Sequence, residues 1–365
     1  MNFFHTHISD KAVELVVETL RSAFVSEGKQ VRRFEEELSR LLGLARPVAV
    51  NSGTSALHLA LAVAGVGPGD EVILPPQTFV ASGFAILMCG AKPVFADIQP
   101  QTGNLDPASL RARVTPRTKA VMPVHWGGYP CDMDEINAIA DEHGLAVVED
   151  AAHALGATYK GRPVGSLSRF TAFSFQAIKH LTTGDGGALC CLHEEDYQTA
   201  RRRRWFGIDR ERDLPSVLGE RVYDLEAVGF KYHMNDLAAA VGLGNLPDAP
   251  AHLARRREIA AAYRKGLTGA PGITLLENRP DRESAHWIFT LLVERREDFA
   301  RALNSRGVPA SVVHQRIDRN RVFGGARGDL PGQRDFDERQ IALPVHVGLT
   351  DDDVAAVVRQ VRVGW

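Results

Sequence analysis

Short apolar runs alternate with helix-like patterns along most of this chain. The runs at residues 71–74, 93–96 and 145–150 are typical of buried strands. Apolar residues recur at helical spacing in 10–24 and 31–42. This alternation predicts an α/β fold with a mainly parallel central sheet that is flanked by helices on both faces.

The last third of the chain has a different pattern, which predicts a smaller α+β domain. We expect a large domain at residues 1–246 and the small domain at 247–365. Within the small domain we expect strands at 287–293, 310–314 and 341–344, helices at 298–306 and from Asp351 onward, and a lid or substrate loop at 315–339.

Composition removes several functional classes. The chain has 365 residues, 44% apolar and 24% charged, with a formal net charge of -2, so nothing global favours nucleic acid or a membrane. The four cysteines have no metal-type spacing, and Cys190 and Cys191 would point to opposite faces of a strand. We expect a reduced, cytoplasmic protein without a signal peptide, a membrane span or a metal site.

One lysine lies between two predicted strands. Lys179 is flanked by Phe173, Phe175, Ile178 and Leu181, and an apolar surround favours a neutral, nucleophilic amine that forms a Schiff base. A surface lysine with its stem on apolar residues has the same pattern.

A carboxylate upstream favours the reactive lysine. The strand at 145–150 ends in Asp150, and ligands of open α/β sheets bind at the carboxyl ends of strands. An acid beneath a pyridine ring keeps the ring nitrogen protonated, so the ring can draw electrons from a substrate. Lys179 and Asp150 together indicate pyridoxal 5'-phosphate (PLP).

A turn of small residues offers a place for the phosphate. Residues 51–55 lead from a strand into a helix, and free backbone N–H groups at a helix start suit an anion. Helix capping alone also explains such residues. Ser174, five residues before Lys179, can reach the phosphate if the chain turns between them, or it is a strand serine bonded to backbone.

Residues 149–156 and 174–179 resemble the signature segments of the DegT/DnrJ/EryC1/StrS aminotransferases. The resemblance covers nearly the whole chain and implies the PLP-dependent transferase fold of type I. It also implies a phosphate grip in the turn that holds Gly53, through Thr54 and Ser55, Phe79 stacked on the pyridine ring, and His153 near the ring hydroxyl.

The same resemblance implies a homodimer in which two subunits complete each active site. Lys231 and His233 stand where many family members carry Asn and Arg that reach the neighbour's cofactor phosphate. Their departure from that pattern weakens this transfer, although lysine still supplies positive charge.

Three further residues are candidate substrate contacts. His125 lies at a strand end, where a structural histidine is at least as frequent. Arg204 ends a run of four arginines, which either is solvated or grips a substrate diphosphate. The resemblance places His314 near the substrate.

The predicted function is amino transfer from L-glutamate or glutamine to a keto sugar, and the resemblance favours a nucleotide-linked 3- or 4-keto-deoxyhexose. A keto-cyclitol aminotransferase stays open. A sugar dehydratase of the same family fits less well, because those relatives carry histidine where Lys179 stands. A non-catalytic binding protein on this scaffold would not require both Lys179 and Asp150.

Overall fold

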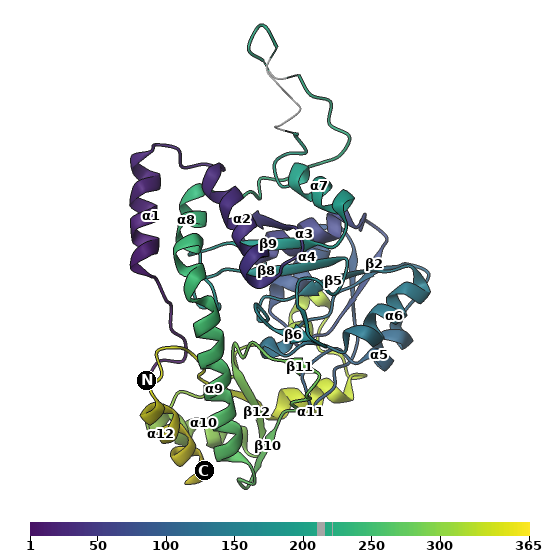
Figure 1. Ribbon diagram of the computed structural model, residues 1–365. Coiled ribbons are helices and arrows are strands. Elements are labelled where there is room, and N and C mark those ends of the chain that lie inside the picture. The colour runs from purple at the N-terminus through teal and green to yellow at the C-terminus, as the bar shows by residue number, and fades with distance from the viewer. Residues whose placement is uncertain (210–215, 221) are drawn as a thin grey trace.

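A seven-stranded sheet forms the centre of the larger part of the molecule (Figure 1). The structure, a computed structural model, describes residues 1–209, 216–220 and 222–365. In spatial order the strands are β1 (Pro47–Val50), β9 (Gly187–Cys191), β8 (Phe170–Ser174), β5 (Ala146–Asp150), β4 (Thr118–Val121), β2 (Glu71–Leu74) and β3 (Lys92–Phe95). β9 runs antiparallel to β1 and β8, and the other neighbours are parallel. The prediction of a mainly parallel sheet is confirmed.

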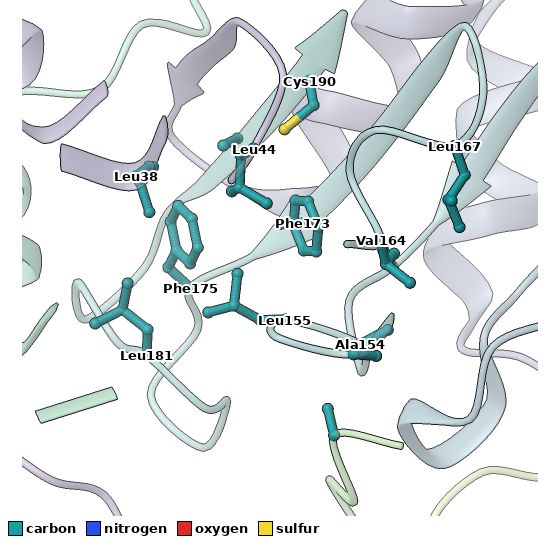
Figure 2. Packing of buried hydrophobic residues seen from close by; sticks show 14 of the residues in the cluster. Leu38, Leu44, Ala154, Leu155, Val164, Leu167, Phe173, Phe175, Leu181 and Cys190 are labelled. Atoms are coloured by element: carbon teal, nitrogen blue, oxygen red, sulfur yellow. The ribbon is translucent and has the colours of Figure 1, made fainter. Parts of the chain in front are cut away.

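Helices cover both faces of this sheet. On one face lie α3 (Gly53–Val63), α4 (Val80–Met88) and α7 (Glu194–Arg203); on the other lie α2 (Lys29–Leu42), α5 (Pro107–Arg113), α6 (Met133–His143) and α8 (Asp236–Asn245). Leu38, Leu44, Phe173 and Phe175 gather in the core of the second face (Figure 2). Each face thus has its own apolar layer, because successive side chains of a strand alternate.

The adjacent cysteines follow that alternation. Cys190 belongs to the core beneath α2 and α8, whereas Cys191 belongs to the core beneath α3 and α4. Both thiols are free, as predicted for this strand.

Helix α1 (Asp10–Arg21) lies against α8 on the outer side of the molecule (Figure 1). Its start is the one expected from the sequence, because the Ser9 side chain accepts a hydrogen bond from the N–H of Ala12. Ahead of α1, residues 1–9 form an extended arm.

A second sheet organises the C-terminal part. Its strands are β10 (Ile273–Leu275), β12 (Phe289–Val293) and β13 (Gln340–Leu343), all antiparallel. Helices α9 (Ala249–Leu267), α10 (Arg296–Ser305), α11 (Pro331–Arg339) and α12 (Asp351–Arg362) accompany it, and a small third sheet joins β11 (Arg282–Glu283) to β6 (Thr158–Tyr159) and β7 (Arg162–Pro163).

The long helix α9 connects the two parts. Leu253 packs in the core of the larger part, while Ile259 and Tyr263 pack in a separate core that holds α10, α12, β12 and β13. The expected boundary near residue 246 precedes this helix and stays a prediction.

Two expectations for the C-terminal part are wrong. Residues 310–314 form no strand, only a bridge between Ser311 and Ala342, because the His314 carbonyl accepts side-chain N–H groups of Gln77 and Gln340. The segment at 315–339 is not an irregular loop, because it contains α11 and two short 3-10 helices, and its role as a lid or substrate segment stays a prediction. No helix in the described part of the chain is long and apolar enough to cross a bilayer.

Candidate active site

A cavity of about 380 Å³ opens at the carboxyl ends of β5 and β8. Asp150 is the last residue of β5, and Ser174 is the last residue of β8. Ligands of open α/β sheets bind at this edge. The predicted residues that line the cavity are Gly53, Thr54, Phe79, Asp150, His153, Ser174, Lys179 and His314.

Lys179 reaches the cavity from the loop that follows β8. The loop folds back on itself, since the N–H of Lys179 donates to the Gln176 carbonyl at 2.9 Å. The Lys179 ammonium nitrogen lies 3.7 Å from the centre of the Trp287 ring. Burial lowers the pKa of Lys179 to about 7, although the Asp150 carboxylate acts in the opposite direction. The amine is therefore partly neutral near pH 7 and can act as a nucleophile or base.

Asp150 is held in place by two hydrogen bonds. The Ser82 hydroxyl donates to one carboxylate oxygen at 2.7 Å, and the N–H of Ala152 donates to the other at 3.2 Å. Ser82 lies in the first turn of α4, so the connection from β2 to α4 orients an acid at the end of β5. The carboxylate is only 6% exposed and faces the cavity.

The start of α3 forms the opposite end of the cavity. Ser52 caps the helix by accepting the N–H of Ser55 at 3.0 Å. A Cβ atom on Gly53 would lie 2.9 Å from the Cβ of Ser174, so only glycine lets the helix start approach the end of β8 this closely. The positive end of the helix and the Thr54 and Ser174 side chains together suit a phosphate.

Aromatic rings form the remaining wall. His153 stacks on Trp287 with ring centres 3.9 Å apart, and His314 lies 5.2 Å from Phe79 and 5.6 Å from His153. Burial, reinforced by the charge of Lys179, lowers the pKa of His314 to about 4 and holds the pKa of His153 well below its usual value. Both imidazoles are thus neutral at pH 7.

One ring nitrogen of each histidine has no hydrogen-bond partner among the described residues. These atoms are the Nδ1 of His153 and the Nε2 of His314, and both are buried. Buried polar atoms are seldom left unpaired in a native protein. Their position in the cavity wall therefore indicates a polar ligand.

The structure does not bring His125 into the cavity. Its ring is fully buried and lies 2.8 Å from a Glu149 carboxylate oxygen, while the other ring nitrogen accepts the N–H of Cys131 at 3.1 Å. The predicted substrate contact is wrong here, since both nitrogens are used within the core.

Arg204 is also a structural residue. Its guanidinium is buried, donates to Glu35 and Glu27, and reaches the Ala49 carbonyl at 3.0 Å. The guanidinium that we expect to bind a substrate diphosphate is thus already paired with two carboxylates. Arg204 lines a different hollow from the one that holds Lys179.

Ser55 and the pair at 231–233 lie outside this cavity as well. The Ser55 hydroxyl donates to the Asn51 side chain at 2.6 Å instead of facing the cavity. Lys231 lies 3.6 Å from the centre of the Trp205 ring, and the same indole contacts the His233 ring. Whether these two side chains serve a neighbouring subunit stays a prediction.

Several lining residues were missed by sequence reasoning. The sequence pattern predicts Trp287 to lie in a strand and places Gln176 and Asp185 only in the lysine loop, whereas all three line the cavity. Trp287 lies more than 100 residues beyond Lys179, and no local pattern links them. The indole N–H of Trp287 donates to the Ile178 carbonyl at 3.0 Å, which fixes the ring beside the lysine.

The lysine, the acid and the helix start in one cavity agree with the comparison with known proteins. The family model of the "DegT/DnrJ/EryC1/StrS aminotransferase family" matches residues 6–362. The chain belongs to this family. As a member of it, the protein is an aminotransferase that uses PLP.

Relatives of this aminotransferase cover almost its whole length. It is 41% identical to the spore coat polysaccharide biosynthesis protein SpsC of Bacillus subtilis, over 97% of this chain and 94% of the relative. It is 35% identical to a dTDP-3-amino-3,4,6-trideoxy-alpha-D-glucose transaminase of Streptomyces venezuelae, over 97% and 91%. The crystal structure of the sugar aminotransferase CalS13 of Micromonospora echinospora superposes with a TM-score of 0.95 at 36% identity, covering 100% of both chains.

The cavity of this aminotransferase fits PLP on structural grounds alone. Lys179 and Asp150 line the same cavity, and Gly53 leaves space at the start of α3 that a Cβ atom would fill. The unpaired ring nitrogens of His153 and His314 in the cavity wall can bind a polar group of the cofactor or substrate. Thr54 and Ser174 would hold the phosphate, and Asp150 the ring nitrogen.

Proposed function

We propose that this aminotransferase transfers an amino group from L-glutamate or glutamine to the keto group of a nucleotide-linked deoxyhexose, at C-3 or C-4. The name of the Streptomyces venezuelae relative includes a dTDP-linked 3-amino sugar, and CalS13 is described as a sugar aminotransferase. The amino donor follows from the family resemblance.

The observation that carries the proposal is the position of Lys179. Its amine has a pKa of about 7 and shares a cavity with Asp150 and the start of α3. An amine with this pKa can accept a proton from a substrate carbon and return it at pH 7. Lysine at this position disfavours the sugar dehydratases, which carry histidine there.

Other residues of the chain divide the remaining tasks. Bound PLP supplies an electron sink for negative charge on a substrate carbon. Asp150, fixed by Ser82 and Ala152, keeps a proton at the ring nitrogen. The neutral imidazoles of His153 and His314 offer donors or acceptors to hydroxyl groups, and the Trp287 ring covers one side of the Lys179 amine.

A panel of keto substrates tests the proposal. Nucleotide-linked 3-keto and 4-keto sugars and keto-cyclitols are incubated with the enzyme and glutamate or glutamine, and release of the keto acid is followed. We expect turnover with a nucleotide-linked keto sugar. Turnover of keto-cyclitols alone, or of none of these compounds, would contradict the proposal.

A second measurement tests the role of Lys179 itself. Borohydride treatment of the PLP-loaded enzyme should attach the cofactor covalently to the peptide that contains Lys179. The same treatment of Lys179→Ala should attach none. Labelling of another lysine in the unaltered enzyme would show that the cofactor anchor has been assigned wrongly.

We further propose that the protein is a homodimer with shared active sites. α1 packs on α8 through Ala12 and Leu15, yet its outer face exposes a second apolar stripe. That stripe consists of Val13, Val17 and Leu20, with exposures of 55%, 39% and 54%, and it continues to Phe24. An apolar stripe of this kind on a surface helix is typical of an interface.

The dimer is tested by light scattering on Leu20→Glu. We expect the unaltered enzyme at twice the chain mass and the variant shifted toward the monomer, with Lys11→Glu on the same helix as the control. If the unaltered enzyme is monomeric and still converts its substrate, both the dimer and the role of Lys231 and His233 in a neighbouring active site are refuted.

A further inference from the structure

Three side chains that can bind a metal meet where the N-terminal arm crosses the start of α9. They are His7 from the arm, Asp248 from the short 3-10 helix Leu246–Asp248, and His252 from α9. Their ligand atoms all lie within 4.8 Å of one another. The His7 Nε2 lies 2.9 Å from an Asp248 oxygen, and the rings of His7 and His252 stand at 84° with centres 4.4 Å apart.

The local geometry turns all three side chains toward one point. Asp248 and His252 are four residues apart at a helix start, so they share one face. Asp248 occupies the N-cap position of α9, but its side chain makes no capping hydrogen bond and faces His7 instead. One turn further, Arg256 donates to the backbone carbonyls of Trp287 and Val345 rather than to Asp248.

We propose that His7, Asp248 and His252 bind a divalent transition-metal ion of the Zn²⁺ class, which fixes the N-terminal arm to α9. Two imidazoles and one carboxylate, with water as a fourth ligand, form a set that Zn²⁺ accepts at about 2.0–2.2 Å. Ligand atoms at these bond lengths lie about 3.4 Å apart in a tetrahedral arrangement. The His7–Asp248 pair at 2.9 Å therefore has to open slightly, and the wider pairs, which lie within 4.8 Å, have to close by up to about 1.4 Å. Such a site goes beyond the sequence, in which no metal-type spacing joins residue 7 to residues 248 and 252.

The two imidazole ligands make metal binding depend on pH. A metal needs neutral imidazoles. Binding should therefore be full near pH 7.5 and weaken below pH 6, where protons compete for the ligands.

The arm links this site to a wall of the cofactor cavity. Next to His7, Ser9 binds Asn245 and Gly244 at the end of α8. Toward its other end, the ring of Phe4 stacks on Trp287 at 5.3 Å, and Trp287 is the ring beside the Lys179 amine. A metal at His7 would hold Phe4 against the outer side of that wall without touching the cavity, because none of its three ligands lines it.

The test is a Co²⁺ titration of the tag-free, PLP-loaded enzyme after chelation and dialysis, followed by visible absorption and by metal analysis. We expect one Co²⁺ per chain, displacement by Zn²⁺, and a rise in Tm on binding. His252→Ala and Asp248→Asn should each weaken Co²⁺ binding at least about tenfold, because even the loss of a residue that only hydrogen-bonds to a metal ligand typically costs about 10–100-fold in affinity.

The control is His193→Ala, which removes an exposed histidine at the N-cap of α7 that is not one of the three proposed ligands. It should bind Co²⁺ as the unaltered enzyme does. Absence of stoichiometric binding to the unaltered enzyme would overturn the proposal. Binding that survives both His252→Ala and Asp248→Asn, whose folding is checked by circular dichroism, would overturn it too.

Discussion

Two adjacent carboxylates at the end of β5 have opposite fates. Glu149 is fully buried, and its carboxylate accepts hydrogen bonds from the Thr171 hydroxyl and the His125 ring. Both partners of this carboxylate therefore lie inside the core. Asp150, one residue later, points to the other side of the sheet edge and lines the cavity. Because successive side chains of a strand point to opposite faces, one acid is buried in the core and the next faces the cavity.

The same contrast separates other predicted residues. Arg204 and His125 are hydrogen-bonded to other groups of the core, and neither lines the cavity. His153 and His314 each keep a buried nitrogen unpaired in the described part of the chain, and both line it. Among the buried polar atoms that have no partner in the described residues, those of His153 and His314 are the ones that line this cavity, and this separates the two histidines from His125 and Arg204.

Isosteric amides at the two acids give the sharpest test of this contrast. Asp150→Asn should lower kcat by on the order of 10³-fold, the factor that one electrostatic contact at the reacting charge often supplies. Glu149→Gln should instead lower the free energy of unfolding by about 1–3 kcal/mol and leave turnover of the folded enzyme largely unchanged. Steady-state kinetics and urea unfolding are measured for both variants. If kcat falls equally in the two variants, the proposed difference between Glu149 and Asp150 is wrong.

Arg204→Met tests the buried cation. Removing the guanidinium leaves Glu35 and Glu27 without their buried partner, so the free energy of unfolding should fall by about 3–5 kcal/mol. The KM of the folded Arg204→Met enzyme for its keto sugar should equal that of the unaltered enzyme. A large rise in KM with normal urea unfolding would instead restore Arg204 as a substrate ligand.

The pH dependence of stability reports on Lys179. Its pKa is about 7 in the folded chain and about 10.4 when unfolded, so between these values the unfolded chain binds more protons. The free energy of unfolding of the cofactor-free protein therefore rises with pH in this window, by about 2 kcal/mol from pH 7 to pH 9. Lys179→Met should lack this share of the rise in urea unfolding; identical slopes for both proteins would mean that burial does not perturb the amine.

The smallest expected effect belongs to Ser82→Ala. The Ser82 hydroxyl donates to Asp150 at 2.7 Å, and losing a hydrogen bond to a charged group costs about 1.5–3 kcal/mol. We expect only part of this cost to reach the reaction, a fall in kcat of about tenfold, because the N–H of Ala152 still holds the other oxygen of Asp150. Turnover that is unchanged in pre-steady-state kinetics would show that Asp150 needs no support from α4.

Local patterns predicted most of the elements that position the site. The runs at β2, β5, β8 and β9, the Ser9 cap and the turn before α3 all appear as expected, because strand period, capping chemistry and glycine tolerance act over a few residues. The segment at 310–314 looked like a strand by the same rule, and side-chain hydrogen bonds from Gln77 and Gln340 to the His314 carbonyl decided otherwise.

The sequence by itself determined the parallel sheet, the lysine and acid at its strand ends and, through the family motifs, the cofactor. Only the tertiary structure decided which polar residues are free to act. Trp287 lies beside Lys179 although more than 100 residues separate them, and Arg204 forms ion pairs with two glutamates. The rings of His7 and His252 are in contact although the two residues are far apart in the sequence. Hydrogen-bond partners are allotted by contacts between distant segments, and no local spacing records them.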